Sequence, residues 1–407
     1  MTLPSIRSVL ATAAVCLTLP SFTHAQATGG TDSTESMIRT MVSRLDFDRY
    51  KATIKGLTSF GDRRQGTDRN RAAVDWIEAQ LKAGGCTNTE RVTYDFAPPV
   101  AAGARPAGAP GAAAGPIRRE VGGGRSRGNR IRTYVNMDSL RQSDPRLRAL
   151  NSQPTTPGQR QEVFCTKVGT THPDEMYIVG AHMDGHGWGE AANDDGSGTA
   201  LVMEIARVFS NPDITTERSI RFVLWNNEET GLNGARAYVD QRAAMQGKEM
   251  PAGSGKYPEP KWLGMIQHDM MLFDHGMPNA DSTIPPQQRP EADVNIEFQM
   301  SSKMALQSQA LAWTLHGANE KFATDYPAAV GPHMTNTDSS PFQDLVASIS
   351  LRENERGKEI GAGWDPHWHQ PTDMFKTFSD KDFRLGLNAA QTTFGALAQL
   401  TGAKLAK

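Results

Sequence analysis

The chain has 407 residues, and its 45 acidic side chains nearly balance its 43 basic ones, for a formal net charge of −2. Without a basic excess, nucleic acid and anionic membranes are not expected as partners. The length suits one large α/β domain, alone or with a small one.

Residues 1–27 have the features of a secretory signal peptide. Arg7 precedes an apolar segment around residues 9–19, and the sequence SFTHAQA offers small residues for cleavage after Ala25 or Ala27. The apolar segment is too short to span a bilayer. We therefore predict a secreted or periplasmic protein with no stable membrane insertion.

Two predicted helices and a low-complexity insert follow residues 1–27. Amphipathic periodicity predicts helices over residues 37–60 and 69–83. An insert at about residues 98–128 is rich in Ala, Gly and Pro and cannot bury a core. We interpret it as a tolerated loop or hairpin insertion, with a substrate-gating role as the alternative.

Two cysteines remain once the signal peptide is removed. Cys86 and Cys165 can pair in an oxidising compartment. Cys165, however, lies in the middle of a predicted strand, whereas Cys86 follows the end of a helix. This placement favours two separately buried thiols, and a disulfide stays open as the alternative.

The polar residues of the central stretch follow buried strands. Residues 176–180 and 220–225 are apolar runs typical of inner strands, and residues 199–209 between them have helical periodicity. In such a βαβ unit the polar loops meet at the carboxyl edge of the sheet. We expect five side chains at that edge: His182, Asp184, Asp194, Glu228 and Glu229.

These residue types suit a metal site. Imidazole and carboxylate groups bind zinc, and a pair of ions needs a carboxylate that bridges them. Asp184, two residues after His182, is better placed to orient that imidazole than to bind metal. Of the adjacent glutamates, one can bind metal while the other takes a proton from water. The alternative is an acidic edge without metal, which would not explain the glycines on both sides of Ser197.

The motifs GAHMD, NDDGSG and NNEETGLNGARAYV closely resemble those of the M28 zinc aminopeptidases, and a weaker likeness runs from about residue 46 to the C-terminus. The M20 peptidases share HxD and EE but place the bridging Asp elsewhere. The resemblance implies a single M28-type domain over residues 36–407. Its fold would be a three-layer α/β/α arrangement with a mixed, mostly parallel sheet. It also implies that Asp194 bridges two Zn²⁺ ions, Glu229 is a ligand and Glu228 is the general base.

The remaining ligands are also placed by the resemblance. Asp269, after the predicted strand at 262–267, and His369 complete the metal set, and Asp373 is expected to orient His369. The competing His367 would face the other way on an extended loop. The family further implies a cis peptide bond between Asp194 and Asp195.

Five more residues are candidates for the substrate pocket. The resemblance places Asp338 and Phe342 in the pocket floor. His186 and Trp188, between the first two motifs, could line its rim or simply pack. Trp368 occupies the position of a tyrosine that steadies the oxyanion in some relatives, so that this task would fall chiefly to zinc.

The expected activity is release of N-terminal residues from peptide substrates by water held between two Zn²⁺ ions, with Glu228 taking its proton. Carboxypeptidase or glutaminyl cyclase activity on the same scaffold is the alternative. An inactive binding ectodomain is a further alternative. The sequence leaves the oligomeric state and the preferred residue open.

Overall fold

A computed structural model describes residues 28–97, 135–276, 279–281, 283–332, 336–353 and 365–406. The predicted signal peptide and the low-complexity insert at about 98–128 lie outside these residues. None of the helices in the described ranges combines the length and hydropathy that crossing a bilayer requires.

An eight-stranded sheet forms the centre of the molecule, in the order β1-β2-β5-β3-β6-β9-β7-β8. The strands are β1 (Thr89–Phe96), β2 (Gly158–Lys167), β3 (His172–His182), β5 (Arg218–Trp225), β6 (Lys261–His268), β7 (Val294–Phe298), β8 (Ala328–Gly331) and β9 (Ser348–Arg352). The inner strands β5, β3, β6 and β9 run parallel, as do β7 and β8, while β1, β2 and the β7–β9 pair add antiparallel contacts. The predicted mixed, mostly parallel sheet is confirmed.

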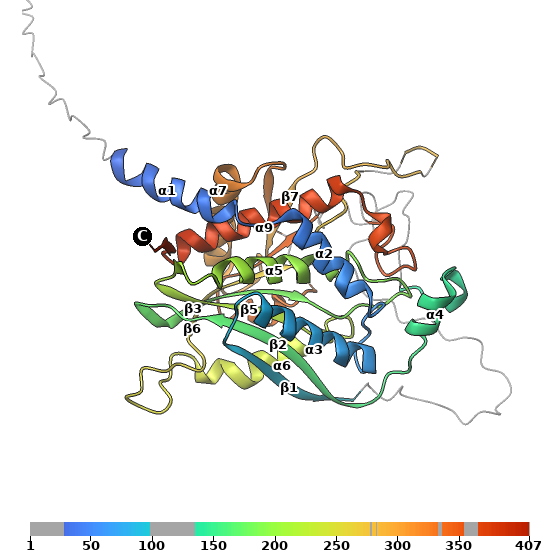
Figure 1. The fold of residues 1–407 in the computed structure, drawn as a ribbon, viewed down its shortest axis with the longest axis horizontal. Coiled ribbons are helices and arrows are strands. Elements are labelled where there is room, and N and C mark those ends of the chain that lie inside the picture. The colour runs from blue at the N-terminus through green and yellow to red at the C-terminus, as the bar shows by residue number, and fades with distance from the viewer. Residues whose placement is uncertain are drawn as a thin grey trace, which may run out of the picture.

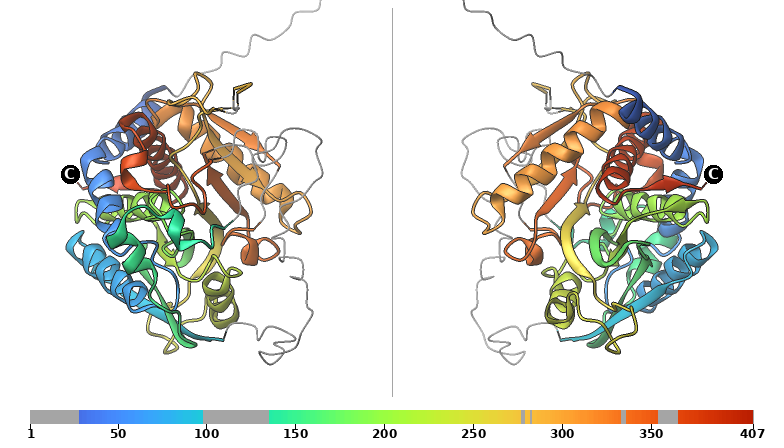
Figure 2. Two further views of the ribbon diagram at one scale, coloured as in Figure 1. Left: turned by 90° about the vertical axis from the view of Figure 1, so that its right-hand side faces the viewer. Right: turned by 90° about the vertical axis from the view of Figure 1, so that its left-hand side faces the viewer.

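Helices cover both faces of this sheet (Figure 1). One face carries α1 (Thr28–Val42), α2 (Phe47–Thr58), α3 (Asp68–Ala83), α5 (Gly196–Phe209), α7 (Ala305–Phe322) and α9 (Asp380–Leu400). The other face carries α6 (Asn233–Arg242), which packs on an aromatic core. A short α4 (Pro145–Asn151) lies beside the sheet, and β4 (Ile214–Thr215) pairs with β10 (Lys404–Leu405). The side views show α1 and α9 lying together in the larger helical layer (Figure 2).

The predicted helix over residues 37–60 is wrong as a single element. The chain forms α1 and α2 instead, because Asp46 adopts an extended conformation and its side chain accepts a hydrogen bond from the backbone N–H of Arg49. An N-cap of this kind starts a new helix rather than continuing the old one.

The favoured interpretation of the cysteines is also wrong, because Cys86 and Cys165 form a disulfide with a Cα–Cα distance of 6.2 Å. β1 pairs antiparallel with β2 so that Thr89 lies opposite Cys165. The turn after α3 therefore brings Cys86 beside the strand that holds Cys165. This pairing register depends on tertiary contacts that the sequence does not display.

Candidate metal centre

The predicted metal ligands converge at the carboxyl ends of adjacent parallel strands. His182 ends β3, the Glu228–Glu229 pair follows β5, and Asp269 follows β6. Because β5, β3 and β6 are neighbours, their C-terminal loops meet at one point. Asp194 comes from the loop before α5, and His369 from the segment before α9. They surround a cavity of about 210 Å³, lined by His182, Asp194, Glu228, Glu229, Thr230, Gly231, Asp269, Asn336, Trp368 and His369.

Asp194 lies between the two imidazoles. Its Oδ1 is 3.3 Å from Nε2 of His182, and its Oδ2 is 3.0 Å from Nε2 of His369. Asp269 Oδ1 approaches His182 Nε2 at 3.9 Å, and Glu229 Oε2 approaches His369 Nε2 at 3.0 Å. A carboxylate with one oxygen directed to each imidazole is the arrangement that a ligand shared by two cations requires.

The buried donors fit metal ions better than they fit one another. Glu229 Oε1 is buried and has no hydrogen-bond partner among the described residues, and Asp194 Oδ2, although 3.0 Å from His369 Nε2, makes no hydrogen bond of acceptable geometry. Three groups of donor atoms each lie within 4.8 Å of one another: His182 with Glu228 and Asp269, His182 with Asp194 and Glu229, and His186 with Glu229 and His369. Imidazole nitrogen with carboxylate oxygen is a zinc donor set. The residues present therefore fit two neighbouring cations.

The electrostatics agree with this fit. Burial lowers the pKa of His369, but the Glu229 and Asp194 carboxylates outweigh it and raise that pKa to about 10. For Glu229, burial raises the pKa, and the imidazoles of His186 and His369 more than offset it, which lowers the pKa to about 2. Without a cation, the carboxylates thus favour a proton on the imidazole. A metal ion would take the place of that positive charge.

Backbone contacts hold His182 and Glu228 in place. Nδ1 of His182 lies 2.9 Å from the backbone carbonyl of Asp184, whereas the Asp184 carboxylate is 4.0 Å away. That carboxylate accepts from the backbone N–H of Glu228 at 3.0 Å. Asp184 thus fixes the imidazole through its main chain and the candidate base through its side chain.

Asp373 contacts the Asp194 loop. Its two carboxylate oxygens accept from the backbone N–H groups of Asn193 at 2.8 Å and Asp194 at 3.1 Å. The Nδ1 atom of His369, which Asp373 was expected to orient, has no hydrogen-bond partner among the described residues. Asp373 therefore positions the shared carboxylate rather than the imidazole.

The sequence analysis did not assign two of the positioning residues. Asp195, joined to Asp194 by the predicted cis peptide bond, accepts from the backbone N–H groups of His182, Gly198 and Met270. It thereby connects the ends of β3 and β6 to the start of α5. Arg352 in β9 donates to Asp269 Oδ2 at 2.7 Å and leaves Oδ1 facing His182. Asp195 stood within the NDDGSG motif and could have been found there, whereas nothing in the sequence around Arg352 indicated its role.

Of the five candidate pocket residues, only Trp368 belongs to the cavity lining among the described residues. Asp338 is buried and accepts from Gln267 Nε2 at 3.4 Å, and Phe342 packs in the aromatic core, with its ring centroid 5.2 Å from that of Trp262. Trp188 lies under the guanidinium of Arg64.

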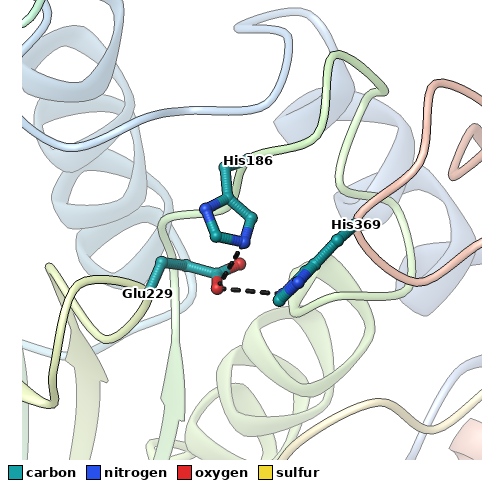
Figure 3. Close-up of side chains that lie close together, drawn as sticks. All are labelled: His186, Glu229 and His369. Carbon is teal, nitrogen blue, oxygen red and sulfur yellow. Dashed lines mark ion pairs between the residues drawn. The ribbon is translucent and has the colours of Figure 1, made fainter. Parts of the chain in front are cut away.

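His186 is the exception among the pocket candidates, because its Nε2 is 3.0 Å from Glu229 Oε2 (Figure 3). It comes from the loop after β3 and lies beside His369 as well. The competing His367 has its Nδ1 2.8 Å from Thr372 Oγ1, outside the cavity lining.

Comparison with known proteins gives the family. A model of Peptidase family M28 matches residues 162–385, which are more than half of the chain and include every residue of the site described above. The chain belongs to peptidase family M28. The resemblance inferred from the three motifs is therefore confirmed.

This M28 protein is similar to several named aminopeptidases. It is 42% identical over 69 residues to aminopeptidase YwaD of Bacillus subtilis, a match that covers 17% of this chain and 14% of that one. It is 35% identical over 274 residues to the probable lipoprotein aminopeptidase LpqL of Mycobacterium tuberculosis, covering 64% of this chain and 50% of the relative. The chain thus spans half or less of the length of these relatives.

The fold matches solved structures over nearly the whole chain. One of them is BSAP, a zinc aminopeptidase from Bacillus subtilis, with a TM-score of 0.58 and 16% sequence identity. The match covers 88% of this chain and 95% of that one. At this identity the likeness shows a shared fold and no more.

Proposed function

We propose that this M28 protein is an exported di-zinc exopeptidase that releases N-terminal residues from peptides. The observation that carries the proposal is the position of Asp194, with one carboxylate oxygen directed to His182 and the other to His369. Asp269 and Glu229 flank these imidazoles, and Glu228 lines the same cavity without being needed as a ligand.

His182, Asp194 and Asp269 would hold one zinc ion, and Asp194, Glu229 and His369 the other. Bound zinc supplies Lewis acidity, which lowers the pKa of water to about 7 and polarises the carbonyl of the scissile bond. The chain must therefore supply the proton transfer and the orientation of the substrate.

Glu228 is suited to proton transfer. Burial raises the pKa of its carboxyl well above the usual value, His182 opposes this effect, and the carboxylates of Asp338, Glu229 and Asp269 add to it. A carboxylate with a raised pKa takes a proton from water more readily and can then return it to the departing amine. The Asp184 carboxylate accepts from the Glu228 backbone N–H and so fixes the main chain that carries this side chain at the cavity.

The cavity itself favours action at a chain end. At about 210 Å³ it is smaller than the usual sites for drug-sized ligands. Its wall is acidic, and the Glu228 carboxylate, which is not among the proposed zinc ligands, can help to receive the positively charged α-ammonium group of a substrate. These features support an aminopeptidase.

Export is supported by the signal-like residues 1–27 and by the disulfide. Disulfides form and persist in the periplasm or outside the cell and are rare in the cytosol. Cys86 and Cys165 are paired here. We therefore place the mature protein in an oxidising compartment.

A panel of matched peptides tests the proposed activity. It contains one peptide with a free N-terminus, its N-acetylated form, its C-terminal amide and a variant that begins with glutamine, each incubated with and without a chelator. We expect loss of N-terminal residues from every peptide except the acetylated one, and none with chelator. Loss of a C-terminal residue would indicate a carboxypeptidase. Loss of ammonia from the glutamine peptide would indicate a cyclase, and the absence of any reaction would indicate a binding protein.

A further inference from the structure

His186 lies beside Glu229 and His369, whereas the sequence analysis left open whether it lines the pocket rim or simply packs. Its Nε2 is 3.0 Å from Glu229 Oε2, which is itself 3.0 Å from His369 Nε2. The rings of His186 and His369 meet nearly at right angles, with centroids 4.0 Å apart. In Figure 3 both imidazoles point toward the same end of the Glu229 carboxylate.

The loop that carries His186 is firmly packed. Gly187 has a φ of 96°, and a Cβ atom there would collide with the backbone of His369. A Cβ atom at Gly185 would lie 2.5 Å from the side chain of Ala191 and 2.9 Å from the carbonyl oxygen of Asp194. Glycines on both sides of His186 thus let the loop press against the segments that carry Asp194 and His369. The imidazole is placed by close backbone packing.

Among the described residues, the Nε2 atom of His186 contacts only Glu229. It is buried, makes no hydrogen bond to any described residue and is directed at Glu229. Its nitrogen belongs to one group of donor atoms with Glu229 and His369, all within 4.8 Å of one another. A buried imidazole nitrogen that contacts only the carboxylate of one predicted zinc ligand, beside a second, has the placement of a ligand.

We propose that His186 is a further ligand of the second zinc ion, an inference that rests on the proposed di-zinc function. That ion would then have four protein ligands: Asp194, Glu229, His369 and His186. The ion at His182 would have three protein ligands: His182, Asp194 and Asp269. Four protein ligands are typical of closed, structural zinc sites, whereas three leave a position for water or substrate. The His186 position is therefore the tighter of the two, and the His182 position is the one that exchanges ligands.

Zinc titration of wild-type protein and of His186→Ala tests this proposal. Metal-depleted protein is titrated with zinc in competition with a chelator of known affinity, and the number of bound ions is read by native mass spectrometry. We expect two stepwise affinities in the wild type. In His186→Ala the tighter step should weaken by at least about tenfold, with little change in the other step.

Two further variants make the result specific. His186→Asn keeps a polar side chain but cannot reach the Nε2 position, so it should weaken the same step even if the alanine variant folds poorly. His172→Ala removes an exposed imidazole far along β3 and should leave both affinities unchanged. In cobalt-substituted protein, loss of the imidazole should also change the visible absorption of one ion.

Unchanged affinities in both His186 variants would overturn the proposal, as would equal weakening of the two steps. The proposed function fails separately, if the wild type binds no zinc or cleaves no peptide. A wild type that binds two ions and cleaves peptides, with His186 variants that bind zinc equally well, would overturn the ligand assignment alone.

Discussion

Two buried clusters of charged side chains lie on the same sheet and differ in how completely they are paired. In one, beneath α6, Arg221 donates to Tyr238 at 2.6 Å, to Thr166 at 3.0 Å and to the Glu259 carboxylate. Tyr238 and Trp262 both donate to the other oxygen of Glu259. Among the described residues, none of these side chains has a buried nitrogen or oxygen that lacks a hydrogen-bond partner.

The candidate metal centre is less completely paired. Carboxylates gather around His182, His186 and His369, and Asp194 and Glu229 each keep a buried oxygen without a hydrogen-bond partner among the described residues. Buried polar groups are almost always satisfied, because an unsatisfied one costs about 1–3 kcal/mol. A buried cluster whose polar groups are all paired stabilises the fold, whereas one with unpaired buried oxygens indicates a binding site for a ligand.

Replacement of Glu228 should have the largest effect on function. Because the proposed mechanism uses Glu228 for proton transfer and not as a ligand, it predicts that Glu228→Gln lowers kcat by about 10²–10⁴-fold and leaves two zinc ions bound. Steady-state kinetics and metal analysis of the same preparation measure both quantities. Near-native turnover, or loss of zinc, would show that this residue has another role.

Breaking the complete cluster should instead destabilise the fold. Arg221→Met removes the cation that is hydrogen-bonded to the buried Glu259 and leaves it only Arg242 Nη1 at 3.9 Å. We expect a loss of about 3–5 kcal/mol in the free energy of unfolding. Urea denaturation measures the loss, and the zinc content of the folded fraction should not change. The double variant Arg221→Met/Glu259→Gln removes both charges and should recover part of the stability. A loss below about 1 kcal/mol in the single variant would refute the distinction between the clusters.

A partly exposed ion pair should show the smallest effect and a defined pH dependence. Hydrogen bonds from Lys82 and Arg91 outweigh burial and lower the pKa of Glu78 to about 2, from an ordinary value of 4.5. The ionised form is therefore favoured in the folded state, and its stabilisation is present above pH 4.5 and lost as the pH falls toward 2. Solvent screening limits it to about 1 kcal/mol or less.

Glu78→Gln measures this contribution. The variant should be less stable than the wild type at pH 7, and the difference should shrink as the pH is lowered from about 4.5. Urea denaturation at a series of pH values follows it. A difference that stays constant down to pH 3 would contradict the shifted pKa.

The fold and the convergence of the ligands could be predicted from sequence because they follow from local patterns. Apolar strands that end in HxD and EE identify parallel strands and place both motifs at one edge of the sheet. The break between α1 and α2 depended on a single cap, Asp46, which a purely periodic pattern does not reveal. The disulfide depended on the register between β1 and β2.

Side-chain direction was the least predictable part of the site. Asp373 had the spacing of a partner for His369, yet its carboxylate binds the backbone of Asn193 and Asp194. Arg352 reaches Asp269 only because β9 lies next to β6. His186 enters the centre because Gly185 and Gly187 let its loop pack closely against Asp194 and His369. Each of these contacts joins residues far apart in sequence, and no local pattern encodes it.

The most direct test of the account is the zinc content of the wild type and of Asp194→Asn after dialysis against buffered zinc. Because each oxygen of Asp194 faces a different imidazole, the account predicts two ions per wild-type chain and weakened binding of both in the variant. Thermal unfolding should show the same loss as a smaller stabilisation by zinc. A wild type that holds fewer than two ions, or an Asp194→Asn protein that keeps both with unchanged affinity, would contradict the account.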